Sequence, residues 1–330
     1  MNDDRAPLLE VRSLTTEFVI ERGGVPRAVR VVDDVSFAIG RGEVLALAGE
    51  SGSGKSVTAL SILRLVPPEG RISAGSIRLE GRELLSLDER ELRRVRGARI
   101  GFVFQEPMTA LNPVFTVGGQ IAEALEVHGV AKGAAARARA VELLDAVRIP
   151  EPARRARDFP HQLSGGMRQR VLIAAAIACR PSLVIADEPT TALDATVQAD
   201  ILDLLGAMRE EFGLSLLLIT HDLGIVARLA DRAAVMYAGR IVEIGPAREV
   251  LASPHHPYTR GLLASLPGSV PGARLEAIPG TVPDLAMLPP GCAFAPRCPD
   301  RFSACDASRP GPVTVSPGRS ARCFLHGGAA

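Results

Sequence analysis

The chain has 330 residues, of which 38 are lysine or arginine and 37 are aspartate or glutamate, so its formal net charge is +1 at pH 7. A hydrophobic content of 47% excludes a disordered chain, and the balanced charge gives no overall reason to expect a nucleic-acid partner. The polar, acidic N-terminus does not resemble a signal peptide, and no apolar run approaches the roughly 18 residues of a membrane-spanning helix.

The predicted elements begin with two strands. Alternating apolar residues predict antiparallel strands over 8–20 and 28–39, with a turn at Gly23 and Gly24 between them. Short β-rich apolar runs follow, and such runs are typical of a sheet that is buried on both faces. These runs are residues 44–47, 98–104, 182–187 and 214–220, and a hairpin is predicted over 233–245. The pattern as a whole predicts an α/β protein.

The sequence "GESGSGKS" at residues 49–56 lies between the first of these runs and a helix-like stretch. It follows the P-loop pattern G-x-x-x-x-G-K-[ST], in which glycine backbone and a helix N-terminus surround a phosphate group. In that pattern Lys55 contacts the β- and γ-phosphates and the Ser56 hydroxyl helps to hold Mg²⁺. The alternative is an ordinary Gly/Ser turn. The residues predicted to bind nucleotide are Gly49, Ser51, Gly52, Ser53, Gly54, Lys55, Ser56 and Val57.

A second motif, "LVIADEP" at residues 183–189, places two carboxylates at the C-terminal end of an apolar strand. Ligands of open α/β sheets bind at that end of the strands. Adjacent residues on a strand point to opposite sides, so Asp187 would face Mg²⁺ while Glu188 orients or deprotonates the attacking water. The structural alternative is a solvated Asp-Glu pair at a strand end.

The pattern becomes helical between Thr116 and Cys179, which indicates a helical lobe at about residues 110–180 inserted in the α/β core. Near its end, "LSGGMRQR" at residues 163–170 again places a glycine pair before a helix. Gln105 and His221 each follow a predicted strand, where a polar residue is ordinarily satisfied by its surroundings.

These motifs, in this order, resemble the ATP-binding cassette (ABC) family. The resemblance implies a P-loop NTPase fold with a RecA-like core, an antiparallel β-subdomain and the inserted helical lobe. It also implies ATP as the ligand, with Mg²⁺ held by Ser56, Gln105 and Asp187. Gln105 is then the Q-loop glutamine and His221 the switch histidine, and both join Glu188 as catalytic residues.

The resemblance assigns the remaining site residues as well. The signature motif is Ser164, Gly165, Gly166 and Met167, and Asp194 is the D-loop aspartate. Phe18 lies where the family places the aromatic residue that stacks on adenine, although phenylalanine is also an ordinary strand residue. In this family two cassettes face each other head to tail, and each ATP lies between one P-loop and the partner's signature motif. A second ATPase subunit, either a copy of this chain or a paralogue, is therefore expected.

The C-terminal part resembles the oligopeptide/dipeptide importer branch of the family through "HPYTRGLLASLP" at residues 256–267 and "GCAFAPRCPDRFSAC" at residues 291–305. We therefore expect an ABC ATPase domain over 1–252 and a C-terminal extension over 253–330. The resemblance implies two membrane permease subunits, an extracytoplasmic solute-binding protein and a location on the cytoplasmic face of the inner membrane. The transported solute is expected to be a dipeptide or oligopeptide, with nickel or another small solute as the alternative.

Four of the five cysteines lie in this extension, at Cys292, Cys298, Cys305 and Cys323. Without a secretory signal, such cysteines favour metal ligation over disulfides, and thiolates suit zinc or iron–sulfur clusters. Few apolar runs in the extension are periodic, so a metal would help to order it. Relatives that share the pattern bind a [4Fe–4S] cluster, which the resemblance therefore implies, with zinc or no metal as the alternatives. Cys179 is interpreted as a small core residue.

Two other classes of protein compete with a transporter ATPase. One is a soluble ABC ATPase that acts on nucleic acid or ribosomes, but the chain has neither two cassettes nor a long coiled-coil insertion. The other is a nucleotide-gated binding module without turnover, which the presence of both Glu188 and His221 disfavours.

Overall fold

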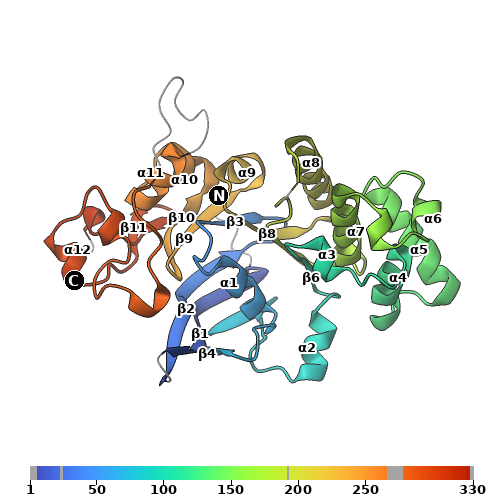
Figure 1. Cartoon of the computed structure of the whole chain (residues 1–330), viewed down its shortest axis with the longest axis horizontal. Coiled ribbons are helices and arrows are strands. Elements are labelled where there is room, and N and C mark those ends of the chain that lie inside the picture. The colour runs from blue at the N-terminus through green and yellow to red at the C-terminus, as the bar shows by residue number, and fades with distance from the viewer. Residues whose placement is uncertain (1–5, 23–24, 192, 266–277, 328–330) are drawn as a thin grey trace. The chain divides into compact units, whose positions relative to one another are not determined.

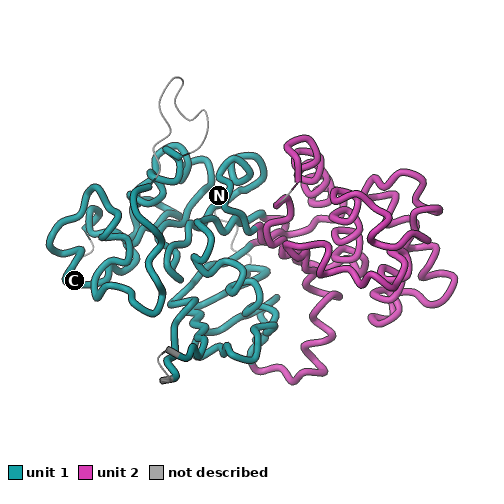
Figure 2. Tube along the Cα trace, in the orientation of Figure 1, with its two compact units in different colours: residues 1–39, 44–85, 219–330 teal, residues 40–43, 86–218 magenta. Residues whose placement is uncertain are grey.

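The computed structural model describes residues 6–22, 25–191, 193–265 and 278–327 (Figure 1). The chain divides into two compact units, which Figure 2 colours separately. Unit 1 contains residues 1–39, 44–85 and 219–330, and unit 2 contains residues 40–43 and 86–218. The predicted turn at Gly23 and Gly24 lies outside the described residues.

Unit 1 contains an antiparallel sheet with the strand order β2-β1-β4-β5. Its two long strands confirm the strand predictions near the N-terminus, and they pair antiparallel from Leu9 opposite Ile39 onward. Leu9 and Val11 are buried while Arg12 is exposed, as expected for strands with one face on a core. The strands are β1 (Leu9–Arg22), β2 (Val25–Ile39), β4 (Gly70–Leu79) and β5 (Arg82–Glu83).

A second, mixed sheet of unit 1 has the strand order β11-β12-β10-β9-β3. Strand β3 runs parallel to β9, whereas β9, β10, β12 and β11 pair antiparallel. The predicted hairpin is confirmed, because Ala238 and Gly239 turn the chain with φ angles of 46° and 82°. The strands are β3 (Val44–Ala48), β9 (Arg232–Tyr237), β10 (Arg240–Pro246), β11 (Val313–Ser316) and β12 (Arg319–Ala321).

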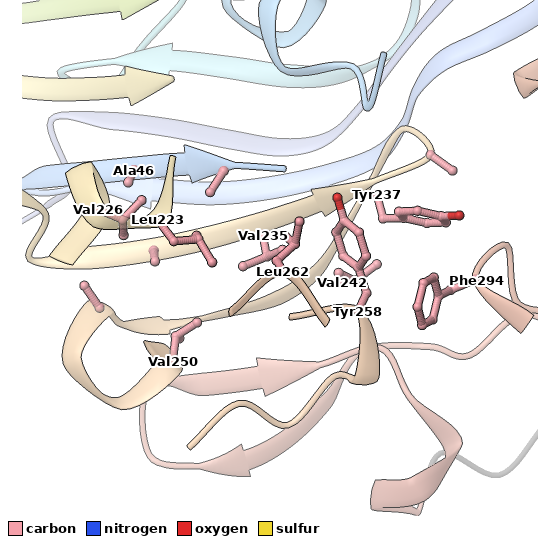
Figure 3. Close-up of a cluster of buried hydrophobic side chains, with 14 residues drawn as sticks. Ala46, Leu223, Val226, Val235, Tyr237, Val242, Val250, Tyr258, Leu262 and Phe294 are labelled. Atoms are coloured by element: carbon pink, nitrogen blue, oxygen red, sulfur yellow. The ribbon is translucent and has the colours of Figure 1, made fainter. Parts of the chain in front are cut away.

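The helices of unit 1 are α1 (Lys55–Ile62), α9 (Leu223–Leu229), α10 (Ala247–Ala252), α11 (Pro257–Ala264), η2 (Leu285–Met287), η3 (Ala295–Arg297), α12 (Ser303–Ala307) and η4 (Phe324–His326). Helices α9, α10 and α11 contribute to a buried cluster with strands β3, β9 and β10 of this mixed sheet, which Figure 3 shows. Tyr237 of β9 packs against the rings of Tyr258 and Phe294, which both belong to the C-terminal extension. The extension therefore contributes side chains to the core of unit 1, which its weak periodicity did not predict.

Unit 2 combines three buried strands with the helical region that the sequence predicts. Strands β6 (Ile100–Val103) and β7 (Leu183–Asp187) are parallel neighbours, and β8 (Ser215–Thr220) follows β7 in the sheet. The helices are α2 (Glu89–Val95), α3 (Pro107–Ala110), α4 (Val117–Val127), α5 (Gly133–Ala146), α6 (Pro152–Arg155), η1 (Pro160–Gln162), α7 (Gly165–Ile177) and α8 (Ala195–Phe212). Within the described part of the chain, every helix is too short or too polar to span a bilayer.

Candidate functional site

The glycines of the predicted P-loop occupy backbone conformations that side chains would obstruct. Gly49 has φ 152°, and a Cβ atom there would lie 2.2 Å from the carbonyl oxygen of Met236. Gly54 has φ 101°, and its Cβ atom would lie 2.5 Å from the carbonyl oxygen of Val31. Only glycine fits both positions, because it carries no Cβ atom and tolerates positive φ. The loop is therefore built from bare backbone, as a phosphate-binding loop requires.

Lys55 begins helix α1 and lies under this loop with its side chain buried. Its ammonium group donates to the carbonyl oxygens of Gly49 and Glu50, at 2.8 Å each, and approaches Ser53 Oγ at 3.4 Å. Gly54 is the N-cap of α1 and offers no side chain to cap the first N–H groups. A buried cation and a helix N-terminus therefore coincide, and both favour an anion.

The two carboxylates of the second motif have different environments. Asp187 is the last residue of β7 and is buried, whereas Glu188 lies one residue beyond the strand with φ 46°. Glu188 therefore lies outside the strand, so the alternation of side chains along a strand does not set the direction of its carboxylate. A non-glycine residue in this conformation costs on the order of 1–3 kcal/mol, and such strain concentrates at functional sites.

Two neighbouring side chains hold the Glu188 carboxylate within unit 2. The hydroxyl of Thr191 donates to Glu188 Oε2 at 2.8 Å, and Gln105 Nε2 donates to the same oxygen at 3.2 Å. Gln105 reaches it because β6 and β7 are parallel neighbours, so the residues that follow them lie at the same edge. The structure thus brings together two residues that the sequence predicts to be catalytic.

The predicted signature motif forms the start of α7 in unit 2. Ser164 is the N-cap, and its hydroxyl accepts the backbone N–H of Met167 at 3.3 Å. A Cβ atom on Gly166 would lie 2.5 Å from Val197 Cγ1, so a side chain there would require the Val197 side chain in the first turn of α8 to shift. Asp194 caps α8 by accepting the N–H groups of residues 196 and 197.

Three other predicted site residues lie on or next to β1, β8 and α1. Phe18 lies on β1 opposite Val29 and Gly70, and its ring lies directly against Gly70. His221 follows β8 and is exposed. Ser56 is the second residue of α1 and is half-buried.

The four cysteines of the extension converge although they are distant in sequence. Cys292, Cys298, Cys305 and Cys323 all line one cavity of about 10 Å³ as free thiols. Burial raises the pKa of Cys298 to about 11 and also raises the pKa values of Cys292 and Cys323. Within residues 6–22, 25–191, 193–265 and 278–327, no three His, Cys, Asp or Glu side chains are arranged to hold a metal ion.

Sequence reasoning missed several residues that hold the site in place. Thr191 was not singled out, although its position three residues after Glu188 is a usual spacing for a local hydrogen bond. Tyr258 and Arg297 both bond to Glu50 of the loop from the C-terminal extension. Tyr258 belongs to the quoted "HPYT" run, but nothing local in the sequence marks its partner.

Comparisons with known proteins agree with this geometry. The sequence model of the ABC transporter family matches residues 32–191, and that of the oligopeptide/dipeptide transporter C-terminal region matches residues 242–305. The "Putative peptide import ATP-binding protein" of Brucella melitensis biotype 1 is 52% identical over 97% of each chain. A protein with the same description from Brucella suis biovar 1 is 50% identical over 96% of this chain and 95% of its own.

Solved structures show the same fold. The ATP-binding cassette MJ0796, solved as a dimer in a post-hydrolysis state with ADP and Pi, is 31% identical, with a TM-score of 0.64 over 73% of this chain and 99% of its own. The protein cbiO1 of Clostridium perfringens, part of the transporter complex cbiONQ, is 27% identical, with a TM-score of 0.63 over 76% of this chain and 92% of its own. The predicted fold class is confirmed. The chain belongs to the ABC transporter family, as an ATPase subunit that carries the oligopeptide/dipeptide transporter C-terminal region.

Proposed function

We propose that this chain is the ATP-hydrolysing subunit of a membrane importer for dipeptides or oligopeptides. The observation that carries this proposal is the match of residues 242–305 to the peptide-transporter C-terminal region in a chain that also has the ABC motifs. The relatives described as peptide import ATP-binding proteins support it, because they match this chain almost end to end. Nickel or another small solute remains the alternative substrate.

The site geometry supports a hydrolytic role for Glu188. Its carboxylate is held by Thr191 and Gln105, so it is oriented before substrate arrives. In the proposed reaction a water molecule attacks the γ-phosphorus, its proton passes to Glu188, and the bond from the γ-phosphorus to the bridging oxygen of ADP breaks. Mg²⁺ would be held by Ser56, Gln105 and Asp187, and it would neutralise charge that develops on the phosphates.

A second ATPase subunit is part of this proposal. Dimeric cassettes are known among the structural relatives. The N–H groups at the start of α7 have Ser164 as their cap and glycine at the next two positions, which suits an approaching phosphate. We assign them to the γ-phosphate of the ATP that is bound by the partner's P-loop, while His221 and Asp194 act as the switch and D-loop residues.

Exposed apolar side chains in unit 2 support attachment to membrane subunits. Met108, Val114 and Phe115 are 59%, 70% and 55% exposed along the segment that follows Gln105. Three large apolar side chains exposed on one short segment favour a protein partner. We assign this segment to contact with the two permease subunits, which would place the chain on the cytoplasmic face of the inner membrane. An extracytoplasmic solute-binding protein would supply the permease subunits with solute.

The cavity lined by the four cysteines supports a metal site for iron or zinc. The donor set of four thiols suits iron and zinc, and the thiols line one cavity. We propose a [4Fe–4S] cluster as the occupant, with zinc or no metal as the alternatives. Binding would replace the thiol protons and tie Cys292, Cys298, Cys305 and Cys323 together.

Transport measured in cells tests the function. A strain that lacks this gene would be assayed for uptake of radiolabelled dipeptide, oligopeptide and nickel, with the wild-type chain or the Lys55→Ala variant supplied in trans. Peptide uptake restored by the wild type but not by Lys55→Ala supports the proposal. Restored nickel uptake with unchanged peptide uptake would assign the alternative solute.

A further inference from the structure

Glu50 occupies a variable position of the P-loop pattern, yet both its backbone and its side chain bind residues of the C-terminal extension. Its backbone N–H donates to the hydroxyl of Tyr258 at 2.8 Å. Its carboxylate forms a two-pronged ion pair with Arg297, in which Nη1 lies 2.8 Å from Oε2 and Nη2 lies 3.0 Å from Oε1. Both partners come from the C-terminal extension, more than 200 positions further along the chain.

Arg297 is held in place by several other groups. Its Nε donates to the carbonyl oxygen of Pro279 at 2.9 Å, and its guanidinium carbon lies 5.9 Å from the centre of the Tyr237 ring. Its side chain is only 5% exposed, compared with 28% for Glu50. A buried guanidinium with this many fixed contacts has little freedom to follow Glu50, so it determines where the Glu50 carboxylate lies.

Tyr258 is fixed by packing and by the start of its own helix. The ring is fully buried and lies 4.5 Å from the centre of Tyr237 and 5.4 Å from that of Phe294 (Figure 3). His256 caps α11 by accepting the backbone N–H of Tyr258, and Pro257 is the first residue of the helix. The run His-Pro-Tyr therefore places one hydroxyl against the phosphate loop.

The contacts of Glu50 are linked to Lys55, whose ammonium group is proposed to contact the phosphates. The carbonyl oxygen of Glu50 accepts a hydrogen bond from Lys55 Nζ, so the N–H of Glu50 is bound to the extension while its C=O is bound to the loop lysine. A shift of Glu50 would move an acceptor of Lys55. The charge of Glu50 matters as well, because an unpaired carboxylate in this loop would repel the phosphates of a nucleotide.

We propose that Arg297 and Tyr258 are positioning residues for the phosphate-binding loop, and that the C-terminal extension thereby sets the affinity of this chain for ATP. Arg297 neutralises and orients the Glu50 side chain, and Tyr258 holds its backbone. This inference rests on the proposed assignment of residues 49–56 to the nucleotide phosphates. It gives the extension a role in nucleotide binding that does not depend on any metal at its cysteines.

Titration of the full-length chain with a fluorescent ATP analogue, in the presence of Mg²⁺, tests the proposal. Arg297→Met leaves the Glu50 charge unpaired, so we expect the dissociation constant to rise about tenfold. The double variant Glu50→Gln/Arg297→Met removes that charge, and we expect its affinity to return to within about threefold of the wild type. Rescue by Glu50→Gln is a result that simple loss of packing at Arg297 would not produce.

The matched control is Arg322→Met. Arg322 also joins the extension to the N-terminal part of unit 1, through an ion pair with Asp34 at 2.8 Å, and this partner lies outside the phosphate loop. We expect its nucleotide affinity to stay within about twofold of the wild type. Tyr258→Phe, which removes only the hydroxyl that accepts the Glu50 N–H, should weaken binding about threefold and serves if Arg297→Met does not fold.

Three results would overturn the proposal. Arg297→Met and Tyr258→Phe could bind the analogue as tightly as the wild type, which shows that the extension does not position the loop. The double variant could bind as weakly as Arg297→Met, which would show that Arg297→Met loses affinity through lost packing and not through the unpaired charge of Glu50. A wild-type chain that does not bind the analogue at all would instead contradict the assignment of the loop to nucleotide, and the proposed function with it.

Discussion

The ammonium nitrogen of Lys55 lies 2.8 Å from the carbonyl oxygen of Gly49, the first residue of the phosphate-binding pattern. A buried ammonium group bonded to neutral carbonyls has a stronger acceptor available once a phosphate enters the loop. Lys55 therefore supports the loop, and we propose that it also supplies the positive charge that contacts the nucleotide phosphates.

Lys55→Ala should weaken ATP binding at least tenfold, because the variant removes a buried charge-assisted contact to the phosphates. Nucleotide titration of the purified chain measures the effect. The matched control is Lys132→Ala, since Lys132 is exposed at the start of α5 in unit 2 and its side chain does not cap the helix. Equal affinities of the two variants would contradict the assignment of Lys55.

Glu188→Gln should retain ATP binding but lose roughly 10²–10⁴-fold in turnover, because glutamine cannot accept the proton of the attacking water. The variant should also accumulate the ATP-bound dimer. ATPase assays in the assembled transporter and size-exclusion chromatography with ATP measure both effects. Glu211→Gln, on the exposed end of α8, is the control. Near-normal turnover of Glu188→Gln would remove Glu188 from the role of base.

Ser164→Arg should abolish ATP hydrolysis while the isolated chain still binds nucleotide, because the signature motif is proposed to act on the partner's ATP. Ser164 also caps α7. Ser164→Ala therefore serves as the control, since it removes the cap at a cost of about 1 kcal/mol without adding a bulky charge. If Ser164→Arg impaired nucleotide binding by the isolated chain as severely as Lys55→Ala, the two-chain site would be wrong.

Substitution of Cys292, Cys298, Cys305 or Cys323 by serine should remove the metal from the extension, because each thiol lines the same cavity. Anaerobic purification, followed by iron, sulfide and zinc analysis and a visible absorption spectrum, measures the loss. Cys179→Ser is the control, since Cys179 lies in unit 2 with its Sγ atom 3.6 Å from the carbonyl oxygen of Ala124. Metal-free wild-type protein would contradict the proposal of a cluster. Zinc in stoichiometric amount, without iron or sulfide, would instead assign the site to zinc.

The stability of unit 1 should decrease in mild acid because of His256. Complete burial lowers the pKa of this imidazole from its ordinary value of 6.5 to about 3. The unfolded chain therefore binds a proton at His256 below pH 6.5 that the folded chain does not bind. The free energy of unfolding is therefore highest, as far as His256 is concerned, above pH 6.5. It decreases by up to about 1.4 kcal/mol per pH unit as the pH falls from 6.5 toward 3.

His256→Asn tests this contribution, since asparagine still offers an oxygen to the N–H of Tyr258 but does not titrate. Thermal unfolding midpoints at pH 7.5 and pH 5 give the comparison. The decrease between the two should be smaller in the variant by about 3 °C, whatever the variant loses at both pH values through altered packing. The exposed His161→Asn is the control. Identical decreases in wild type and His256→Asn would contradict the prediction.

The sequence alone determined the features that contiguous residues encode. The residue types of 49–56 predict a phosphate loop, because the glycine spacing, the lysine and the helix start that follows are local properties of the sequence. The strands over 183–187 and 215–220 are fully buried, as their continuous apolar runs predict. The helical lobe and the hairpin at Ala238 and Gly239 were predictable for the same reason.

Only the tertiary structure shows which distant residues contact the phosphate loop and the other predicted site residues. The ion pair between Glu50 and Arg297 joins residues 247 positions apart, and no local pattern can mark such a partner. The left-handed backbone of Glu188 and the convergence of the cysteines on one cavity likewise depend on packing around them. Tyr258 and Phe294 are buried because the mixed sheet of unit 1 provides an apolar surface for them, although their own segment has little periodicity. Local backbone chemistry is encoded by neighbouring residues, whereas burial and pairing depend on whichever distant segment the fold brings into contact.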